Sequence, residues 1–294
     1  MTQQEKNNVT PKTAIIADAG MATRFLPATK VVPKSLLPVG NLPTLLWNIR
    51  EAKAAGAKKI IVVTNARSYD TIKKFLSEDK ELYNYLERNN KLNRMYEYEE
   101  ILGGLSIDIV IQNPQYKYGT AAPLLSVEKL LSDEPFMYMF ADDITLGKDG
   151  IMRSLVDAYN QYKNVFKSLY AVIAVQPIEW DQVHKYGVVK YRKQITEYIS
   201  QMEMVIEKPN KEEAPSNHVS YGRYLIDPQI FEALNYDRRY LDTLPEYWIQ
   251  PALTKLAEQG VVLTAFDPKI TWYTTGDPVN MYKAWEAWYK TVAK

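Results

Sequence analysis

The stretch "TAIIADAGMATRFLPATKVVPKSLLP", residues 13–38, joins a short apolar run to a long basic loop. Residues 13–18, "TAIIAD", have the apolar and β-branched composition of a buried strand. The loop after it carries Gly20, Arg24, Lys30 and Lys34. In open α/β sheets, ligands bind at the carboxyl ends of the strands, where a loop offers backbone N–H groups besides its cationic side chains. The stretch therefore predicts an α/β sheet with an anion-binding loop after its first strand.

Strand-like and helical patterns alternate through the rest of the first half. The strand-like runs are residues 58–65, 105–112 and 135–143, and the helical patterns are residues 44–56, 77–102 and 121–134. Such alternation is typical of parallel strands linked by helices. The second half is less regular, with strand-like runs at 168–177, 186–191, 203–209, 219–227 and 261–267 and helical patterns at 228–235, 245–260 and 278–294. We predict an α/β, Rossmann-like fold with a mixed, mostly parallel sheet flanked by helices.

Neither a repeat nor a linker divides the chain. We therefore predict a single domain over residues 13–294, because α/β domains often exceed the average domain size. We also predict a flexible N-terminal tail over residues 1–12, because this stretch is polar.

Composition narrows the classes of function. The 294 residues carry a net charge of +1, with no long block of one sign, so we expect no nucleic-acid partner and no membrane partner. No apolar run approaches the ~18 residues of a spanning helix, and the polar start lacks the hydrophobic core of a signal peptide. The absence of cysteine excludes disulfides and thiolate metal sites. These features favour a cytoplasmic protein with small-molecule ligands.

The side chains of the basic loop suit a polyphosphate. Arg24 offers a bidentate fork to phosphate oxygens, Lys34 a compact point charge, and Gly20 a backbone without a Cβ. The loop is neither a Walker A motif nor a dinucleotide fingerprint, because the glycine spacing of both is missing. Taken alone, it is more typical of a solvated basic turn.

The loop and several longer motifs together resemble those of one enzyme family. The loop's "TRFLPATKVVPKSLLPV" resembles the G-x-G-T-R-x-L-P-x-T-x-x-x-P-K-x-x-L-P signature of sugar-1-phosphate nucleotidyltransferases, and most closely that of their bacterial UTP:glucose-1-phosphate uridylyltransferase branch. The resemblance continues through "YGTAAPL" (residues 118–124), "FADDIT" (residues 140–145) and "YGVVKY" (residues 186–191). Residues 207–224 match the more specific pattern E-K-P-x(5)-P-S-N-x(4)-G-R-Y, and the helical insert at residues 81–101 is similar to that of the uridylyltransferases.

The resemblance implies a reaction in which glucose 1-phosphate attacks the α-phosphorus of UTP, giving UDP-glucose and pyrophosphate. Such chemistry needs positioning and charge stabilisation by lysine, arginine and Mg²⁺ rather than a protein nucleophile. Neither His184 nor His218 needs a catalytic role. The resemblance also implies a nucleotide-binding half over residues 13–150, a sugar-binding and C-terminal half over residues 151–294, and a homo-oligomer, either a dimer or a tetramer.

The family's functional residues carry over onto matching positions of this chain. The resemblance implies catalytic roles for Arg24, Lys34 and Lys208, nucleotide binding by Ala19, Gly20, Met21, Arg24, Gln112, Gly119 and Thr120, sugar binding by Asp142, Gly187, Glu207 and Lys208, and Mg²⁺ ligation by Asp142. Glu246 matches an acidic family position whose neighbours differ here. Lys30 belongs to the pattern without a distinct role.

Each assignment has a structural alternative. If Glu207 and Lys208 continue one strand, their side chains point to opposite faces, and one of them is a solvated charge. Asp142 and Asp143 follow a strand and are also typical of turn-capping aspartates, so only the resemblance ranks Asp142 first.

Three departures from the family pattern matter. Ala22 replaces its second glycine, a mild change at negative φ but a costly one at positive φ. Thr274 stands where the family carries its second metal-binding aspartate, which leaves Asp143 or Asp277 as substitutes. "LPEYWIQPAL" (residues 244–253) keeps only the glutamate of the family's G-D-E-x-Q-L-T-D-A segment. Two alternatives to a UDP-glucose-forming enzyme therefore remain: the same reaction with another nucleotide or sugar, and a poorly catalytic nucleotide-sugar-binding homologue.

Overall fold

Nine strands form the central sheet of the computed structural model, which describes residues 8–236 and 242–293. Their order is β5-β4-β1-β6-β11-β8-β12-β10-β9. The strands are β1 (Thr13–Asp18), β4 (Lys59–Thr64), β5 (Ser106–Ile111), β6 (Phe136–Phe140), β8 (Leu169–Pro177), β9 (Gly187–Gln194), β10 (Ile199–Glu207), β11 (His218–Ile226) and β12 (Val261–Ala265). Only β10 and β11 of these described strands run against the others, so the predicted mixed, mostly parallel sheet is confirmed.

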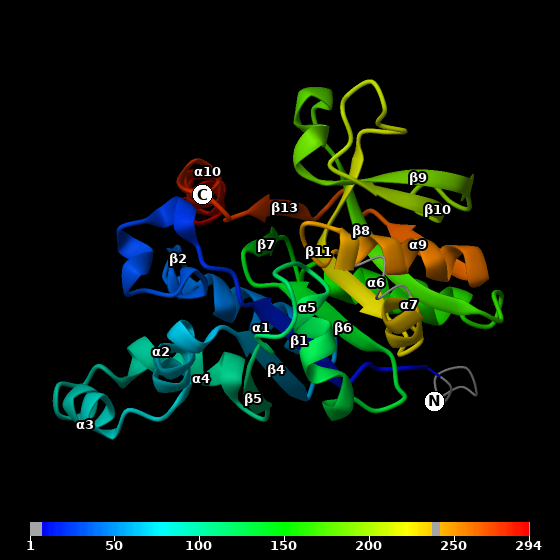
Figure 1. Cartoon of the computed structure of the whole chain (residues 1–294). Coiled ribbons are helices and arrows are strands. Elements are labelled where there is room, and N and C mark those ends of the chain that lie inside the picture. Colours follow the sequence, from blue (N-terminus) through cyan, green and yellow to red (C-terminus); the bar gives the residue numbers. More distant parts are fainter. Residues whose placement is uncertain (1–7, 237–241, 294) are drawn as a thin grey trace.

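Helices cover both faces of this sheet (Figure 1). Alternation along β1 sends Ala14 and Ile16 into one hydrophobic core and Ile15 into the other, as the two-residue period of a strand requires. The first core contains residues of α1 (Thr44–Ala54), α2 (Ala66–Leu76), α4 (Tyr96–Leu102) and α6 (Ile151–Tyr162). The second contains residues of α5 (Ala122–Val127), α7 (Ile230–Tyr236) and α9 (Gln250–Gln259).

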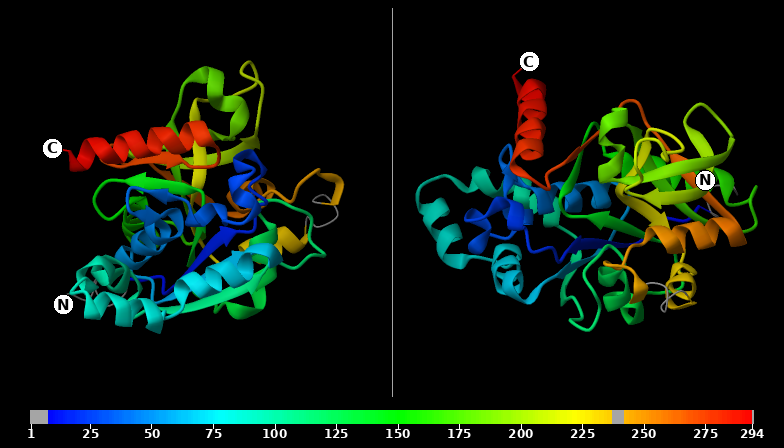
Figure 2. Two further views of the ribbon diagram at one scale, coloured as in Figure 1. Left: turned by 90° about the vertical axis from the view of Figure 1, so that its left-hand side faces the viewer. Right: turned by 45° about the horizontal axis from the view of Figure 1, so that its top comes forward.

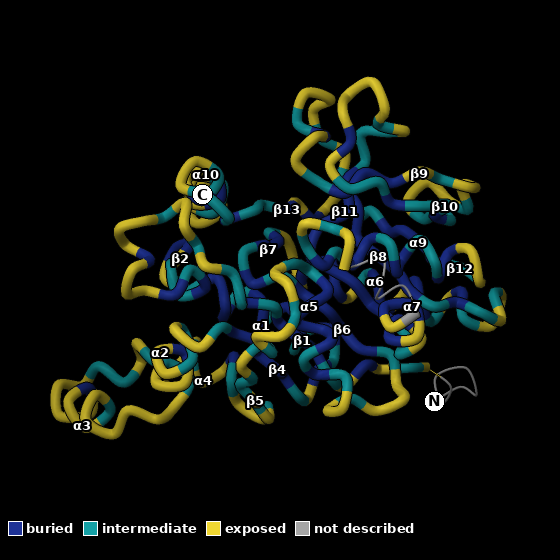
Figure 3. Tube along the Cα trace, in the orientation of Figure 1, coloured by how far each residue is buried: buried dark blue, intermediate teal, exposed yellow. Residues whose placement is uncertain are grey.

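Two short ribbons and the C-terminal helix lie outside the main sheet. Strand β7 (Asp143–Leu146) pairs with β13 (Thr271–Thr274), and β2 (Pro38–Val39) pairs with β3 (Leu42–Pro43). Helix α10 (Pro278–Val292) lies at the edge of the molecule (Figure 2) and packs Met281 and Ala284 against Val39 and Ile144. Helix α3 (Lys80–Arg88), in the predicted helical insert, is largely exposed (Figure 3). The β7–β13 pairing brings the chain around residue 274 next to the end of β6.

Strands from both halves of the chain share the central sheet, because β6 of the first half pairs with β11 of the second. The predicted tail falls partly outside the described residues, which begin at residue 8. Within it, the Val9 backbone exchanges two hydrogen bonds with the Asn160 side chain, and the Lys12 carbonyl accepts one from the Lys59 N–H. Within the described ranges, every helix is too short or too polar to cross a membrane.

Candidate active site

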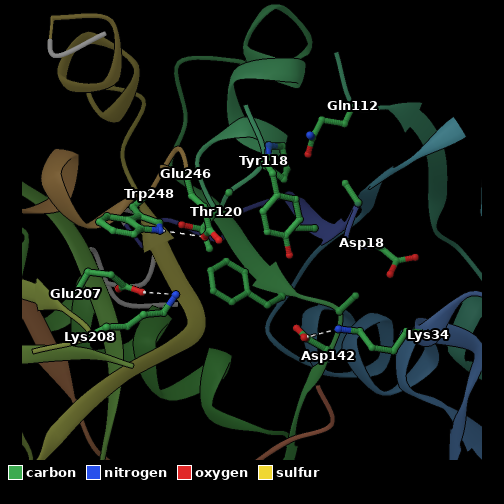
Figure 4. A pocket seen from close by; sticks show the side chains of 17 residues that line it. Asp18, Lys34, Gln112, Tyr118, Thr120, Asp142, Glu207, Lys208, Glu246 and Trp248 are labelled. Atoms are coloured by element: carbon green, nitrogen blue, oxygen red, sulfur yellow. Dashed lines mark hydrogen bonds and ion pairs between the residues drawn. The ribbon is translucent and has the colours of Figure 1, made fainter. Parts of the chain in front are cut away.

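A cavity of about 240 Å³ opens at the carboxyl ends of β1 and β6 (Figure 4). Segments from both halves of the chain line it. The lining consists of residues 17–20, Lys34, Gln112, residues 118–120, Pro123, residues 140–142, Glu207, Lys208, Glu246 and Trp248. Nine of the twelve residues predicted to form the site therefore lie together: Ala19, Gly20, Lys34, Gln112, Gly119, Thr120, Asp142, Glu207 and Lys208.

The three other predicted residues lie around this cavity. Met21 lines a smaller pocket of about 30 Å³ that shares Gly20 and Lys34 with the cavity. Arg24 is exposed and lies on the same side of Gly276 as Asp142. A Cβ built on Gly276 would be 3.8 Å from Arg24 Nη1 and 3.3 Å from Asp142 Oδ2. Gly187 does not line the cavity. It lies behind Glu207, because a Cβ there would come within 3.1 Å of Glu207 Oε2.

Lys34, in the loop after β1, and Asp142, after β6, form a charged pair at the cavity. Lys34 Nζ donates a 2.5 Å hydrogen bond to Asp142 Oδ2, and the two side chains are 14% and 33% exposed. Burial alone would raise the pKa of Asp142, but the Lys34 ammonium holds that pKa below its ordinary value. Burial alone would lower the pKa of Lys34, and Asp142 raises it instead. Both groups are thus charged at neutral pH.

The structure separates Asp142 from its neighbour Asp143. The Asp143 side chain is buried, and its Oδ2 accepts a 2.9 Å hydrogen bond from the Gly222 N–H. Burial raises the pKa of this carboxyl to about 6. Asp143 therefore fastens β7 to β11 in the interior, whereas Asp142 faces the cavity. Asp277, the other proposed substitute for the family's second aspartate, caps α10 by accepting a hydrogen bond from the Asn280 N–H.

Glu207 and Lys208 both face the cavity, so the expectation that adjacent strand residues diverge is wrong here. Strand β10 ends at Glu207, and Lys208 has a left-handed backbone with φ of +49°. That conformation breaks the alternation and turns Lys208 Nζ to within 3.8 Å of Glu207 Oε1.

Ala22 also has a left-handed backbone, with φ of +51°, immediately before the turn that carries Arg24. Of the two conformations that the sequence leaves open for Ala22, positive φ is the costly one, because a residue with a side chain loses about 1–2 kcal/mol in this region. We expect Ala22→Gly to raise the free energy of unfolding by about 0.5 kcal/mol, since glycine's greater freedom in the unfolded chain offsets part of the relief. Urea denaturation of the two proteins measures the difference, and a less stable glycine variant would contradict the assignment.

Thr274 lies beside Asp142. Thr274 Oγ1 and Asp142 Oδ2 are each 3.3 Å from where a Cβ on Gly276 would be, and the Asp142 carbonyl accepts hydrogen bonds from the N–H and Oγ1 of Thr275. Thr274, which stands where the family pattern has an aspartate, thus does lie next to Asp142, but its side chain carries a neutral hydroxyl.

Sequence reasoning gave no role to seven residues that line the cavity: Ala17, Asp18, Tyr118, Pro123, Phe140, Ala141 and Trp248. Asp18 had a signal, since it is a carboxylate at the end of a buried apolar strand. Its Oδ2 accepts a 2.6 Å hydrogen bond from Ser35 Oγ, and burial raises its pKa to about 7. Asp18 is therefore only partly ionised at neutral pH, next to a site predicted to hold polyphosphate.

The raised pKa of Asp18 predicts a pH-dependent stability. A carboxyl whose pKa is higher in the folded chain destabilises the fold as the pH rises from about 4 to about 7. We expect Asp18→Asn to raise the free energy of unfolding by about 2 kcal/mol at pH 8, because no charge must then be buried, with the gain vanishing near pH 4. Urea denaturation at both pH values measures this, and equal midpoints at pH 8 would refute it.

The wall containing Glu246 and Trp248 is attached to the loop at residues 118–121. The Tyr247 N–H donates to the Tyr118 carbonyl at 2.8 Å, and the Ala121 N–H donates to the Tyr247 carbonyl at 2.7 Å. Gly119 permits this approach, because a Cβ there would lie 2.4 Å from the Tyr247 oxygen. The helix predicted from residue 245 consequently begins only at Gln250.

Comparison with known proteins agrees with this geometry. The model of the nucleotidyl transferase family matches residues 13–290. A UTP–glucose-1-phosphate uridylyltransferase of Pseudomonas aeruginosa is 31% identical over 86% of this chain and 87% of its own length. One from Bacillus subtilis is 33% identical over 87% of this chain and 84% of its own.

Solved structures show the same likeness. An apo UDP-glucose pyrophosphorylase superposes with a TM-score of 0.84 and a UDP-glucose complex with 0.82. Both are 27% identical to this chain, covering 96% of it and 99% of their own chains. By its sequence motifs, its sheet and the family model that spans nearly its whole length, this chain belongs to the nucleotidyl transferase family.

Proposed function

We propose that this protein joins UTP and glucose 1-phosphate to give UDP-glucose and pyrophosphate. One observation carries the proposal beyond the relatives' names: a single cavity holds the Lys34–Asp142 pair on one side and the Glu207–Lys208 pair on the other (Figure 4). Two cations facing each other across a cavity suit two phosphate-bearing substrates that must meet within it.

The reaction requires the two substrates to be aligned. An oxygen of the sugar phosphate forms a bond to the α-phosphorus of UTP as the bond from that phosphorus to the bridging oxygen of pyrophosphate breaks. On the nucleotide side, Lys34 stabilises charge on the α-phosphate and the leaving pyrophosphate, and Arg24 at the rim contacts the outer phosphates. On the sugar side, Lys208 holds the attacking phosphate. Gly20 lets the backbone approach the nucleotide, and Gly119 keeps the loop at residues 118–121 paired with Tyr247 beside it.

The residues present fit a Mg²⁺ ion held mainly by its substrate. Within the described residues, no three acidic or histidine side chains cluster as an all-protein metal site. Magnesium is commonly held by one or two carboxylates together with substrate phosphates and water, and Asp142 supplies one carboxylate at the cavity. Thr274 Oγ1 is the nearby neutral oxygen. When bound, the ion would neutralise phosphate charge during the transfer.

Pyrophosphate release across a grid of nucleoside triphosphates and sugar 1-phosphates, with and without Mg²⁺, tests this function. We expect fast release for UTP with glucose 1-phosphate, and its loss when EDTA removes the metal. Fast release for another pair would reassign the substrates but keep the reaction. No release for any pair, with nucleotide binding still detectable, would favour the poorly catalytic homologue.

Two further properties stay predictions: a homo-oligomer, dimer or tetramer, and a cytoplasmic location. An exposed apolar stripe on α10, formed by Val279, Tyr282, Tyr289 and Val292, supports self-association. Sedimentation equilibrium measures the oligomeric state.

A further inference from the structure

Trp248 is an aromatic wall of the cavity that no predicted role explains. One hydrogen bond holds its ring, and two more hold the backbone on either side of it. The indole Nε1 donates a 3.1 Å hydrogen bond to Glu246 Oε2, the preceding residue Tyr247 pairs with Tyr118, and the following Ile249 N–H donates to Thr120 Oγ1 at 3.0 Å. A ring fixed in this way presents a pre-organised flat surface, which binds at a lower entropic cost than a mobile side chain.

The Trp248 ring stands next to the predicted phosphate-binding cation. Lys208 Nζ lies 5.8 Å from the ring centroid, in cation–π geometry, and the left-handed backbone of Lys208 directs that ammonium into the cavity. A sugar 1-phosphate bound to Lys208 through its phosphate has its pyranose ring only one bridging oxygen away. The ring therefore falls within reach of the indole face.

Two carboxylates stand beside the indole. Glu207 is 13% exposed and lines the cavity; its Oε1 lies 3.8 Å from Lys208 Nζ, whereas its Oε2 is buried on the side of Gly187. A carboxylate that lines a cavity beside a cation is a strong acceptor for the hydroxyl donors of a ligand. Glu246 Oε2 is fixed by the indole N–H. Carboxylates beside an aromatic face match the two surfaces of a hexose, whose hydroxyl edge donates hydrogen bonds and whose C–H face is apolar.

We propose that Trp248 is a sugar-specificity residue: the pyranose ring of a neutral hexose 1-phosphate stacks on its indole while Glu207 and Glu246 accept hydrogen bonds from the hydroxyls. The inference rests on the proposed function and deepens it. A hexuronate 1-phosphate, which would bring a third carboxylate toward these two, is a poor substrate by the same arrangement.

Steady-state kinetics of Trp248→Ala and Trp248→Phe test the stacking. We expect Trp248→Ala to raise KM for glucose 1-phosphate about 10-fold or more, the size of one good aromatic contact, while KM for UTP stays within about 2-fold. Trp248→Phe keeps a flat aromatic face, although the phenyl ring is smaller than indole and lacks its N–H, so its KM for the sugar stays within about 3-fold of the parent. Trp180→Ala, which removes an exposed tryptophan that does not line the cavity, is the matched control and leaves both KM values unchanged.

Calorimetric titration with UDP and with UDP-glucose separates this inference from the proposed function, because it needs no turnover. Stacking predicts that Trp248→Ala weakens UDP-glucose about 10-fold and leaves UDP unchanged. Equal weakening of both ligands, or a thermal midpoint far below that of the parent, would show a structural role for Trp248 and overturn the inference. A parent that turns over the sugar, with Trp248→Ala unchanged in KM, would overturn it while leaving the function intact. A parent that binds neither ligand would instead overturn the function.

Discussion

Asp142→Asn is expected to lower kcat by at least about 10³-fold while the chain stays folded, because it removes one charge from the centre of the site without changing its shape. Two effects combine. The amide is a poor ligand for Mg²⁺ compared with the carboxylate. Lys34, whose ammonium lies 2.5 Å from Asp142 Oδ2, also loses the partner that fixes its position. Pyrophosphate release at saturating substrates measures kcat, and circular dichroism checks the fold.

The neighbouring residue provides the matched control for this experiment. Asp143→Asn changes the same type of side chain one position along, but Asp143 is buried and bonded to the Gly222 N–H rather than facing the cavity. It should lower stability and leave kcat within about 10-fold of the parent, since it touches no substrate. A kcat for Asp142→Asn within 10-fold of the parent, or equal losses in the two variants, would remove Asp142 from the reaction.

The elements that position the basic loop after β1 could be predicted because their signals are local. Residues 13–18 form a buried strand by composition, and strand ends in α/β sheets converge on one edge, so the loop bearing Gly20 and Lys34 falls at the ligand-binding edge. The observed β1, at Thr13–Asp18, agrees with the predicted boundaries. Such patterns depend only on neighbours in sequence, and one chain suffices to interpret them.

The side of the cavity that contains Glu207, Lys208 and Trp248 was harder to predict, because long-range contacts and an unusual backbone conformation shape it. The two-residue period of a strand sends Lys208 away from Glu207, and only the left-handed φ at Lys208 reverses this. The helical pattern from residue 245 does not reveal that Tyr247 pairs with Tyr118, which keeps the segment before Gln250 out of the helix and leaves Trp248 lining the cavity. Tertiary hydrogen bonds override local propensity in both cases.

Arg223 is the residue that ties this site to the core. It is fully buried, and its Nε donates a 2.9 Å hydrogen bond to Glu51 Oε2. Its other nitrogens donate to the Asp143 carbonyl at 2.8 Å and to the Gly222 carbonyl at 2.7 Å. Glu51 in turn accepts a 3.1 Å hydrogen bond from the Met152 N–H at the start of α6. One guanidinium thus joins α1, α6, β11 and the turn that carries Asp142.

Arg223→Met is therefore expected to lower the free energy of unfolding by about 3–5 kcal/mol, because it leaves Glu51 as an uncompensated buried charge and removes the hydrogen bonds from Arg223 to the Asp143 and Gly222 carbonyls. Urea denaturation at constant m-value measures the loss. The double variant Glu51→Gln with Arg223→Met also removes the unpaired charge of Glu51, so it should be more stable than Arg223→Met alone. Its loss of unfolding free energy should therefore be smaller than the sum of the losses of the two single variants. A loss below about 1 kcal/mol in the single variant would mean that water solvates Glu51, and the turn bearing Asp142 would then need another support.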